Sequence, residues 1–242
     1  MIEKVEWDSE FFSRKIGRLT KVPQGKKLKN LIHQAHNKGY EYLSCRLILD
    51  KIAEIQLLEK HGFYLTDIGI VWEKKIIKNI SNLKSQISNS NIREATGKDS
   101  PMLKTTVRGL FKDSRFYNDP FFTKKEADKV YQAWVENSVE DKTIKVFVAE
   151  KSGFITCKRL SKNRGDIPHI GVIPKSQGKG IGTSLMHRAL KWFKENGVNT
   201  ATVRTQANNS IAMNFYKKLG FEVKYIDMTM GLILSMELKK KA

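Results

Sequence analysis

The chain contains two copies of one pattern, and this internal repeat restricts its fold more than any other feature of the sequence. When the numbering is shifted by 158 residues, four residues of the first half fall on identical residues of the second: Gly39 on Gly197, Arg46 on Arg204, Gly62 on Gly220 and Phe63 on Phe221. The helical and extended patterns between these positions coincide as well. Such a repeat predicts two copies of one supersecondary unit that pack against each other.

The first copy reads as alternating helices and strands. Residues 1–20 mix aromatic and apolar positions, residues 28–39 and 52–62 have helical spacing, and residues 40–49 and 63–76 read as strands. Gly39 and Gly62 are the stop signals of the two helices. Residues 78–91 are rich in Asn and Ser and poor in aromatics, which predicts a linker at 81–90 between domains 1–80 and 91–242.

The second half has the same alternation with more elements. It opens with a short strand at 91–95 and a helix whose start is marked by Asp99, Ser100 and Pro101. A loop at 111–122, a helix at 126–139, a hairpin turning at 151–153 and a strand at 167–174 follow. A helix from Ile181, a strand at 200–206, a helix ending at Gly220 and one or two closing strands complete the chain. This order predicts an α+β fold with a central mixed, mostly antiparallel sheet.

The composition favours an anionic partner. The formal net charge is +19 and the sequence pI about 9.8, which suits nucleic acid, an anionic membrane surface or a ligand that carries phosphates. The lysines are scattered, with short groups at 26–29, 74–78 and 239–241, and they do not alternate with aromatics as in a base-stacking groove. We therefore interpret most of them as a solvated surface, which disfavours nucleic acid.

Other residues limit the compartment and the cofactors. Cys45 and Cys157 lack metal or disulfide spacing, and no apolar run resembles a signal peptide or a membrane span, so we expect a cytoplasmic protein. His33 and His36 lie three residues apart without further ligands, which favours a surface pair over a metal site. No metal is expected, and the sequence is compatible with a homodimer.

A glycine-rich stretch at 177–182, read as QGKGIG, follows an apolar strand and opens a helix. Gly178, Gly180 and Gly182 allow the backbone to lie against a ligand, and the free N–H groups of the helix start attract anions. Lys179 adds a charge. The spacing fits neither the dinucleotide fingerprint nor a P-loop. At the shift of 158, Gly180 and Gly182 correspond to Val22 and Gln24, so only the second copy has this cradle.

The ordered set of motifs from Arg93 to Phe221 resembles the GCN5-related N-acetyltransferase (GNAT) superfamily. The set consists of the strand before QxxGxG, the loop and helix, Asn208-Asn209 and the helix AMNFYKKLGFE. The resemblance implies acetyl-CoA as cosubstrate. It implies that the pyrophosphate lies on backbone amides of Gln177, Gly178, Lys179, Gly180, Ile181, Gly182 and Thr183, the pantetheine beside Ile170, Gly171 and Val172, and the cofactor arm against Asn209.

The same resemblance implies Tyr216 as general acid and the N–H of Val172 as donor to the thioester carbonyl. A thiolate is weakly basic, so a phenol with an ordinary pKa near 10 need only donate a hydrogen bond or a proton as it leaves. Tyr216 corresponds to Leu58 in the first copy, and the alternative is a tyrosine packed in the core. His169 precedes the cofactor strand and is either a general base or a strand-end histidine with a surface partner.

The acceptor is expected to lie against the loop at 111–122, where Arg115, Phe116 and Tyr117 suit a phosphate and a base or sugar face. The alternative is a structural aromatic plug. Trp7, Phe11 and Phe12, the SRF loop and YQAWVENSV also resemble the dTDP-fucosamine acetyltransferases, which implies transfer to the 4-amino group of a nucleotide-linked dideoxy sugar. A peptide, small-amine or antibiotic N-acetyltransferase stays open, as does a non-catalytic acyl-CoA-sensing or nucleic-acid-binding module.

Overall fold

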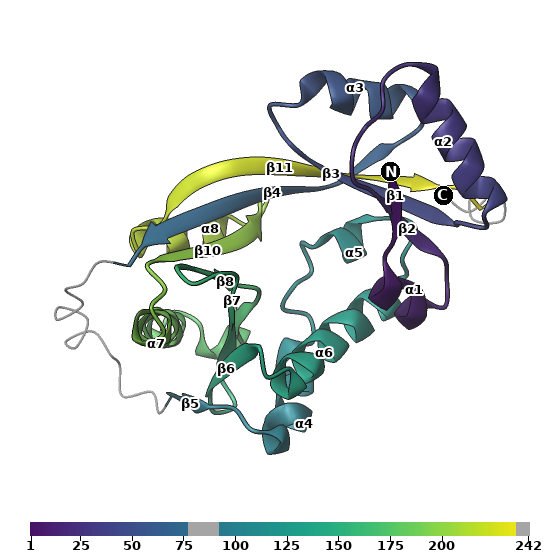
Figure 1. Cartoon of the computed structure of the whole chain (residues 1–242). Helices are drawn as coiled ribbons and strands as arrows, with labels where there is room; N and C mark the ends of the chain where they lie inside the picture. Colours follow the sequence, from purple (N-terminus) through teal and green to yellow (C-terminus); the bar gives the residue numbers. More distant parts are fainter. Residues whose placement is uncertain (77–91, 236–242) are drawn as a thin grey trace.

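The computed structural model describes residues 1–76 and 92–235 (Figure 1). The expected linker at 81–90, Asn91 and the lysine group at 239–241 lie outside the described residues. The first half forms β1 (Ile2–Lys4), α1 (Glu6–Phe12), β2 (Ile16–Leu19), α2 (Lys26–Asn37), β3 (Tyr42–Ile48), α3 (Ile52–Lys60) and β4 (Tyr64–Lys75). Residues 6–12, where no helix was expected, thus form a short helix.

The second half begins with β5 (Ile92–Glu94), α4 (Ser100–Val107), α5 (Arg115–Asn118) and α6 (Lys124–Glu140). It continues with β6 (Ile144–Ala149), β7 (Gly153–Arg159), β8 (Arg164–Ile167), β9 (Ile170–Val172), α7 (Ile181–Glu195), β10 (Thr200–Gln206), α8 (Ser210–Lys218) and β11 (Glu222–Ile233). The strand expected at 167–174 is divided into β8 and β9 around His169. The expected loop at 111–122 contains the one-turn helix α5, and the chain closes with one long strand.

The repeat is reproduced residue by residue. A shift of 158 carries the bounds of β3, α3 and β4 onto those of β10, α8 and β11 without a difference. The four glycines that the repeat aligns (Gly39, Gly62, Gly197 and Gly220) all have φ between 72° and 84°. This left-handed conformation ends a helix at low cost only at glycine, which explains why the stop signals occur in both copies.

The two copies exchange strands within one continuous sheet. The strand order is β1-β2-β3-β11-β4-β10-β8-β7-β6-β5, with β9 paired to β7. Each copy's last strand therefore lies beside the other copy: β11 pairs with β3, and β4 pairs with β10. The predicted α+β fold with a mixed, mostly antiparallel sheet is confirmed. The ranges 1–80 and 91–242 stay a prediction about chain segments, because one sheet runs through both.

A pseudo-twofold axis passes between β4 and β11, where Gly69 pairs with Asp227, its own equivalent in the repeat. The flanking pairs are related in the same way: Asp67 pairs with Thr229, and Tyr225 pairs with Val71. The register shifts of the two strands lie at equivalent places as well, at Thr66 and Lys224. The molecule thus has an internal symmetry whose centre is occupied by one aspartate and one glycine.

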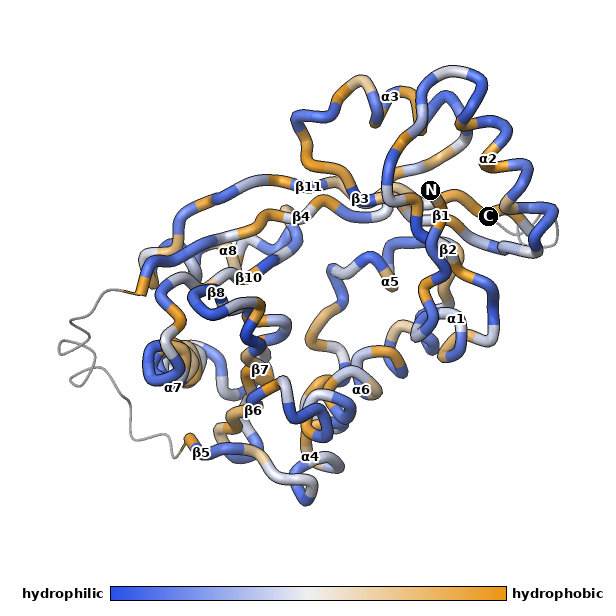
Figure 2. Tube along the Cα trace, viewed as in Figure 1, coloured by the Kyte–Doolittle hydropathy of each residue, from blue (hydrophilic) through white to orange (hydrophobic). Residues whose placement is uncertain are grey.

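Three apolar clusters hold the layers together. One lies between α2, α3 and the first-half strands, and a second lies under α7 and α8. In α7 the apolar residues lie on the side of the helix toward the sheet (Figure 2). The third joins the two halves, since Phe12 and Ile16 of the first pack with Phe116 and Val130 of the second. Among the described residues, no helix has the length and apolar character needed to cross a membrane.

Candidate active site

The glycine-rich stretch forms a cradle at the start of α7. Gly178 and Gly180 have φ of 75° and 76°, and Gly180 is the N-cap of the helix. Gln177 donates a hydrogen bond from Nε2 to the carbonyl oxygen of Val172 (2.9 Å), which ties the loop to β9. The first turn of α7 carries no acidic side chain. The free N–H groups and the positive end of the helix dipole therefore suit a phosphate-bearing cofactor.

A gap in the sheet begins beside this cradle. β8 pairs in parallel with β10, but β9 continues along β7 alone among the described strands. The carbonyl of His169 accepts a hydrogen bond from Thr156 of β7, and the N–H of Ile173 donates one to Ser152. Because successive residues of a strand point their backbone groups to opposite sides, the N–H groups of Ile170 and Val172 point away from β7, into the gap.

Tyr216, the residue expected to act as general acid, lies on α8. It is 4% exposed, and its ring lies against Trp72, Phe215 and Phe221. No hydrogen bond joins its hydroxyl to another described residue, and burial raises its pKa. The phenol is therefore protonated at neutral pH and can act as a donor. Asn209 is the N-cap of α8, and its Oδ1 accepts a hydrogen bond from the N–H of Ala212 (3.0 Å).

His169 lies where β8 ends and β9 begins. Its ring is surrounded by Phe111, Tyr131 and Trp134 at centroid distances of 5.6, 6.2 and 5.5 Å. Its Nδ1 is buried and has no partner among the described residues. Burial lowers the pKa of the ring to about 4, so the imidazole is neutral at pH 7 and is a weaker base than an exposed histidine.

The three residues expected to face an acceptor hold internal contacts. Arg115 forms an ion pair with Asp8 (3.1 Å), and its guanidinium lies 4.3 Å from the centre of the Phe116 ring. Phe116 is 1% exposed and packs in the cluster between the halves, which corrects the expectation that its ring faces a substrate. The Tyr117 hydroxyl donates to Asp128. These contacts match the aromatic plug, and a substrate role for Arg115 and Tyr117 stays a prediction.

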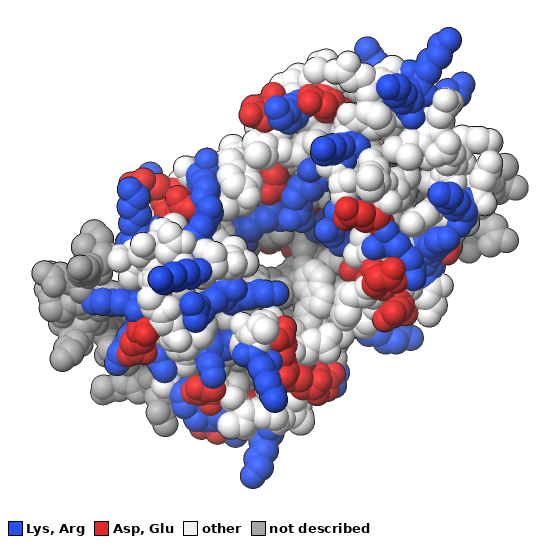
Figure 3. All heavy atoms as spheres, in the orientation of Figure 1, with Lys and Arg blue, Asp and Glu red and all other residues white. Residues whose placement is uncertain are grey.

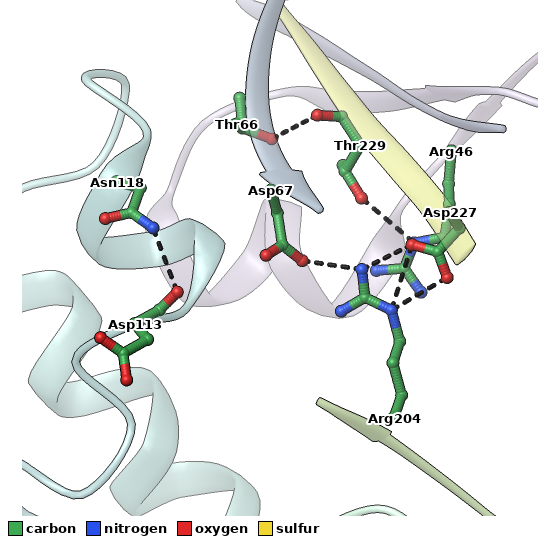
Figure 4. A network of polar contacts seen from close by, with 8 residues as sticks. All are labelled: Arg46, Thr66, Asp67, Asp113, Asn118, Arg204, Asp227 and Thr229. Atoms are coloured by element: carbon green, nitrogen blue, oxygen red, sulfur yellow. Dashed lines mark hydrogen bonds and ion pairs between the residues drawn. The ribbon is translucent and has the colours of Figure 1, made fainter. Parts of the chain in front are cut away.

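A charged network occupies the symmetry centre (Figure 4). Arg204 of β10 is 2.8 Å from Asp67 and 2.5 Å from Asp227, and both carboxylates are buried. A Cβ at Gly69 would lie 2.0 Å from the Arg204 Cζ, so only glycine leaves room for this side chain. Burial acts to lower the pKa of Arg204, but the pairs with Asp227 and Asp67 outweigh it and raise the pKa.

Arg46, the repeat equivalent of Arg204, is differently placed. Its Nε donates to Thr229 Oγ1 (3.2 Å) and lies 3.8 Å from Asp227, which Arg204 already holds. The side chain is only partly desolvated, and this desolvation, followed by the nearby charge of Arg204, lowers its pKa. Both arginines line a pocket of about 460 Å³, called here the basic pocket, whose other cations are Arg164 and Lys224.

The sequence reasoning missed the basic pocket and the carboxylates beside it. The signal was present in part, because Arg46 and Arg204 coincide in the repeat, and a charged residue shared by two copies of a strand deserves a structural explanation. Asp67 and Asp227 gave no such signal, since their equivalents are Tyr225 and Gly69. Within the described ranges, no group of three or more His, Cys, Asp or Glu side chains is arranged to hold a metal ion.

Some known proteins match the half of the chain that contains the cradle, and others match nearly the whole chain. Residues 108–221 match the acetyltransferase (GNAT) family. This match covers just under half of the chain. An N-acetyltransferase of Methanocaldococcus jannaschii is 30% identical over 150 residues, which cover 58% of this chain and 64% of that protein. A dTDP-fucosamine acetyltransferase of Escherichia coli is 23% identical over 231 residues, 92% of this chain and 94% of that one.

Structural comparison extends the GNAT likeness to both halves. A tandem GNAT protein from the clavulanic acid biosynthesis pathway superposes with a TM-score of 0.63 at 10% identity, covering 91% of this chain and 75% of that one. This shows the fold alone, and it agrees with the repeat. GNAT enzymes transfer an acetyl group from acetyl-CoA to an amine, so the predicted family and enzyme class are confirmed.

Proposed function

We propose that this GNAT enzyme transfers an acetyl group from acetyl-CoA to the amine of a nucleotide-linked amino sugar. The observation that carries the proposal is the basic pocket beside the gap in the sheet. At about 460 Å³ it has the size of a small-molecule site, and it is lined by residues of both halves. Its cations suit a phosphate-bearing acceptor. The E. coli relative, named for a dTDP-linked sugar, matches over 92% of the chain, including the half without a cradle.

In this proposal, acetyl-CoA supplies an acyl group activated as a thioester. The cradle from Gln177 to Thr183 holds its pyrophosphate through backbone N–H groups, and Ile170, Gly171 and Val172 flank its pantetheine. Asn209 lies beside the same arm at the start of α8. The N–H of Val172, which points into the gap, donates a hydrogen bond to the acyl carbonyl oxygen and stabilises the charge that develops there.

Two protonation roles complete the proposal. Tyr216 donates its proton, or a hydrogen bond, to the leaving sulfur, since burial keeps the phenol protonated. His169 is the base in this proposal: its ring, neutral at pH 7 and only weakly basic, accepts the proton of the attacking amine directly or through water. The aromatic rings around His169 fix its orientation and exclude bulk water from one side of the site.

A thiol-release assay with acetyl-CoA tests the acceptor class. The panel contains nucleotide-linked amino sugars, the same sugars without the nucleotide, α-amino peptides and aminoglycosides. We expect turnover with the nucleotide-linked amines and at least about 10-fold lower kcat/KM for the free sugars, which lack the phosphate contacts. Turnover confined to peptides or aminoglycosides contradicts the proposal.

A further inference from the structure

The symmetry centre treats its two equivalent arginines unequally. Arg204 is flanked by Asp227 and Asp67. At the repeat-equivalent positions around Arg46, the residues are Gly69 and Tyr225, which carry no charge. Arg204 is therefore held between two buried carboxylates, whereas Arg46 has only a distant share of one. Arg204 therefore has its hydrogen-bond donors occupied by carboxylates. Arg46 lacks the second carboxylate, so its remaining donors can bind another anion.

The donors of Arg46 are free on the side of the basic pocket. Its Nε is fixed by Thr229, and none of the hydrogen bonds or ion pairs among the described residues uses its two terminal nitrogens. The side chain is 49% exposed, so a ligand can reach it. A planar guanidinium that is held through Nε and has both terminal nitrogens unused can donate hydrogen bonds to two oxygens of a phosphate.

The rest of the pocket adds two cations, and carboxylates lie among them. Arg164 and Lys224 share a single carboxylate, Glu73. Asp166 also lines the pocket, where it accepts a hydrogen bond from Thr202 (2.8 Å), and burial raises its pKa. Figure 3 shows a hollow between the two halves with Lys and Arg side chains along its rim.

The pocket lies on the opposite face of the sheet from α7. Gly165 and Ala201 face this helix, since a Cβ on Gly165 would lie 2.4 Å from the Phe193 ring and Ala201 packs in the same cluster. Their strand neighbours Asp166 and Thr202 line the pocket on the other face. The phosphates of coenzyme A, held at the start of α7, are thus on the wrong side to fill it.

We propose that Arg46, with Arg164 and Lys224, binds the diphosphate group of the acceptor and thereby sets the distance between that group and the site of transfer. This inference rests on the proposed function for the identity of the acceptor. His169 lies between β8 and β9, three residues after Asp166, so the chain places the two residues no more than about 10 Å apart. A single sugar ring can bridge this span, so a diphosphate at the pocket directs an amine across the ring toward His169.

Binding of a nucleoside diphosphate without an amine tests the subsite apart from catalysis. Calorimetric titration with thymidine 5′-diphosphate is carried out on the full chain, with and without saturating coenzyme A. We expect Arg46→Gln to raise the Kd roughly 10- to 100-fold, as expected for lost charge-assisted hydrogen bonds, and to leave the Kd of acetyl-CoA unchanged. Arg18→Gln, at an exposed position of β2, is the matched control and leaves both values unchanged.

The outcomes separate the two proposals. Loss of diphosphate binding when coenzyme A is saturating places the probe in the cradle and overturns the subsite, as does an unchanged Kd in a folded Arg46→Gln variant. Wild-type protein that acetylates nucleotide amino sugars but binds no nucleoside diphosphate overturns the subsite alone. Binding that depends on Arg46 in a protein that acetylates only peptides supports the subsite and overturns the proposed function. Circular dichroism and the Tm of each variant establish that it is folded.

Discussion

The two halves of this protein share the bounds of three consecutive elements, yet they differ at the glycines and the tyrosine that are proposed to act on acetyl-CoA. The second half has the cradle, Tyr216 and a gap beside β9, and at the equivalent positions the first half has Val22, Gln24 and Leu58. The first half contributes Arg46 and one wall of the basic pocket instead. In the function proposed here, one copy holds the cofactor and the other forms part of the acceptor side.

The largest expected effect concerns the two equivalent arginines. Arg204→Met leaves Asp67 and Asp227 buried without their main partner, so we expect a loss of about 3–5 kcal/mol in the free energy of unfolding. Arg46→Met removes a half-exposed side chain and costs less than about 1 kcal/mol. Urea denaturation of both variants measures this difference, and equal losses would contradict the asymmetry described for the symmetry centre.

Replacing Tyr216 removes from the second copy the phenol that the first copy lacks. Tyr216→Phe keeps the ring among Trp72, Phe215 and Phe221 but removes the acid, and we expect kcat to fall by about 10²-fold. Tyr216→Leu, the residue type of Leu58, is expected to have a similar kcat and lower stability because the ring packing is lost. Steady-state assays at neutral pH decide the point. Full turnover by Tyr216→Phe would remove the general-acid role.

The cradle can be converted in the same manner. Gly180→Val introduces the residue found at position 22 where φ is 76°, a conformation that β-branched side chains rarely adopt. We expect the Kd of acetyl-CoA to rise by at least about 10-fold with a modest loss of stability. The reciprocal change in the first copy, Val22→Gly, serves as the control and should create no second site. Two acetyl-CoA molecules per chain in that variant would contradict the view that the first copy lacks the other parts of the site.

The smallest expected effect is a pH dependence carried by His169. Its folded-state pKa, about 4, lies below the ordinary value near 6.5. The unfolded chain therefore binds the extra proton first, and the stability contributed by the neutral ring is complete above about pH 6.5 and is lost as the pH falls toward 4. When the pH is lowered from 7 to 5, the free energy of unfolding of the wild type should fall by on the order of 1 kcal/mol more than that of His169→Gln. Thermal unfolding at the two pH values measures this difference. Parallel pH profiles would show that the ring is protonated as easily in the folded state.

Much of the fold follows from local patterns in the sequence. The repeat fixed which segments are equivalent, and glycines such as Gly62 and Gly220 marked where helices end, because these signals depend on backbone conformation at single positions. The partner of each strand could not be predicted in this way. β4 and β11 carry the same pattern, so either could complete either copy, and the choice depends on packing between residues far apart in the chain.

The candidate site also has one part that the sequence predicts and one part that it does not. The cradle is a local motif of six residues, and its glycines have the conformations that the motif requires. The basic pocket is assembled from strands of both halves, so no continuous stretch of sequence contains it. Arg115 is expected from the sequence to face a phosphate, but its partner, Asp8, lies 107 residues earlier, and only the structure brings them together.

The exchange of strands also has a consequence for how the chain is made on the ribosome. β3 and β4 are separated in the finished sheet by β11, whose last residue is synthesised 158 residues after the end of β4. At about 5–20 residues per second, this delay is roughly 8–30 s. During that time the first half is present without its central neighbour, and its exposed strand edges are open to pairing with other chains. We therefore expect the newly made chain to stay prone to aggregation until β11 has been synthesised and has paired with β3 and β4.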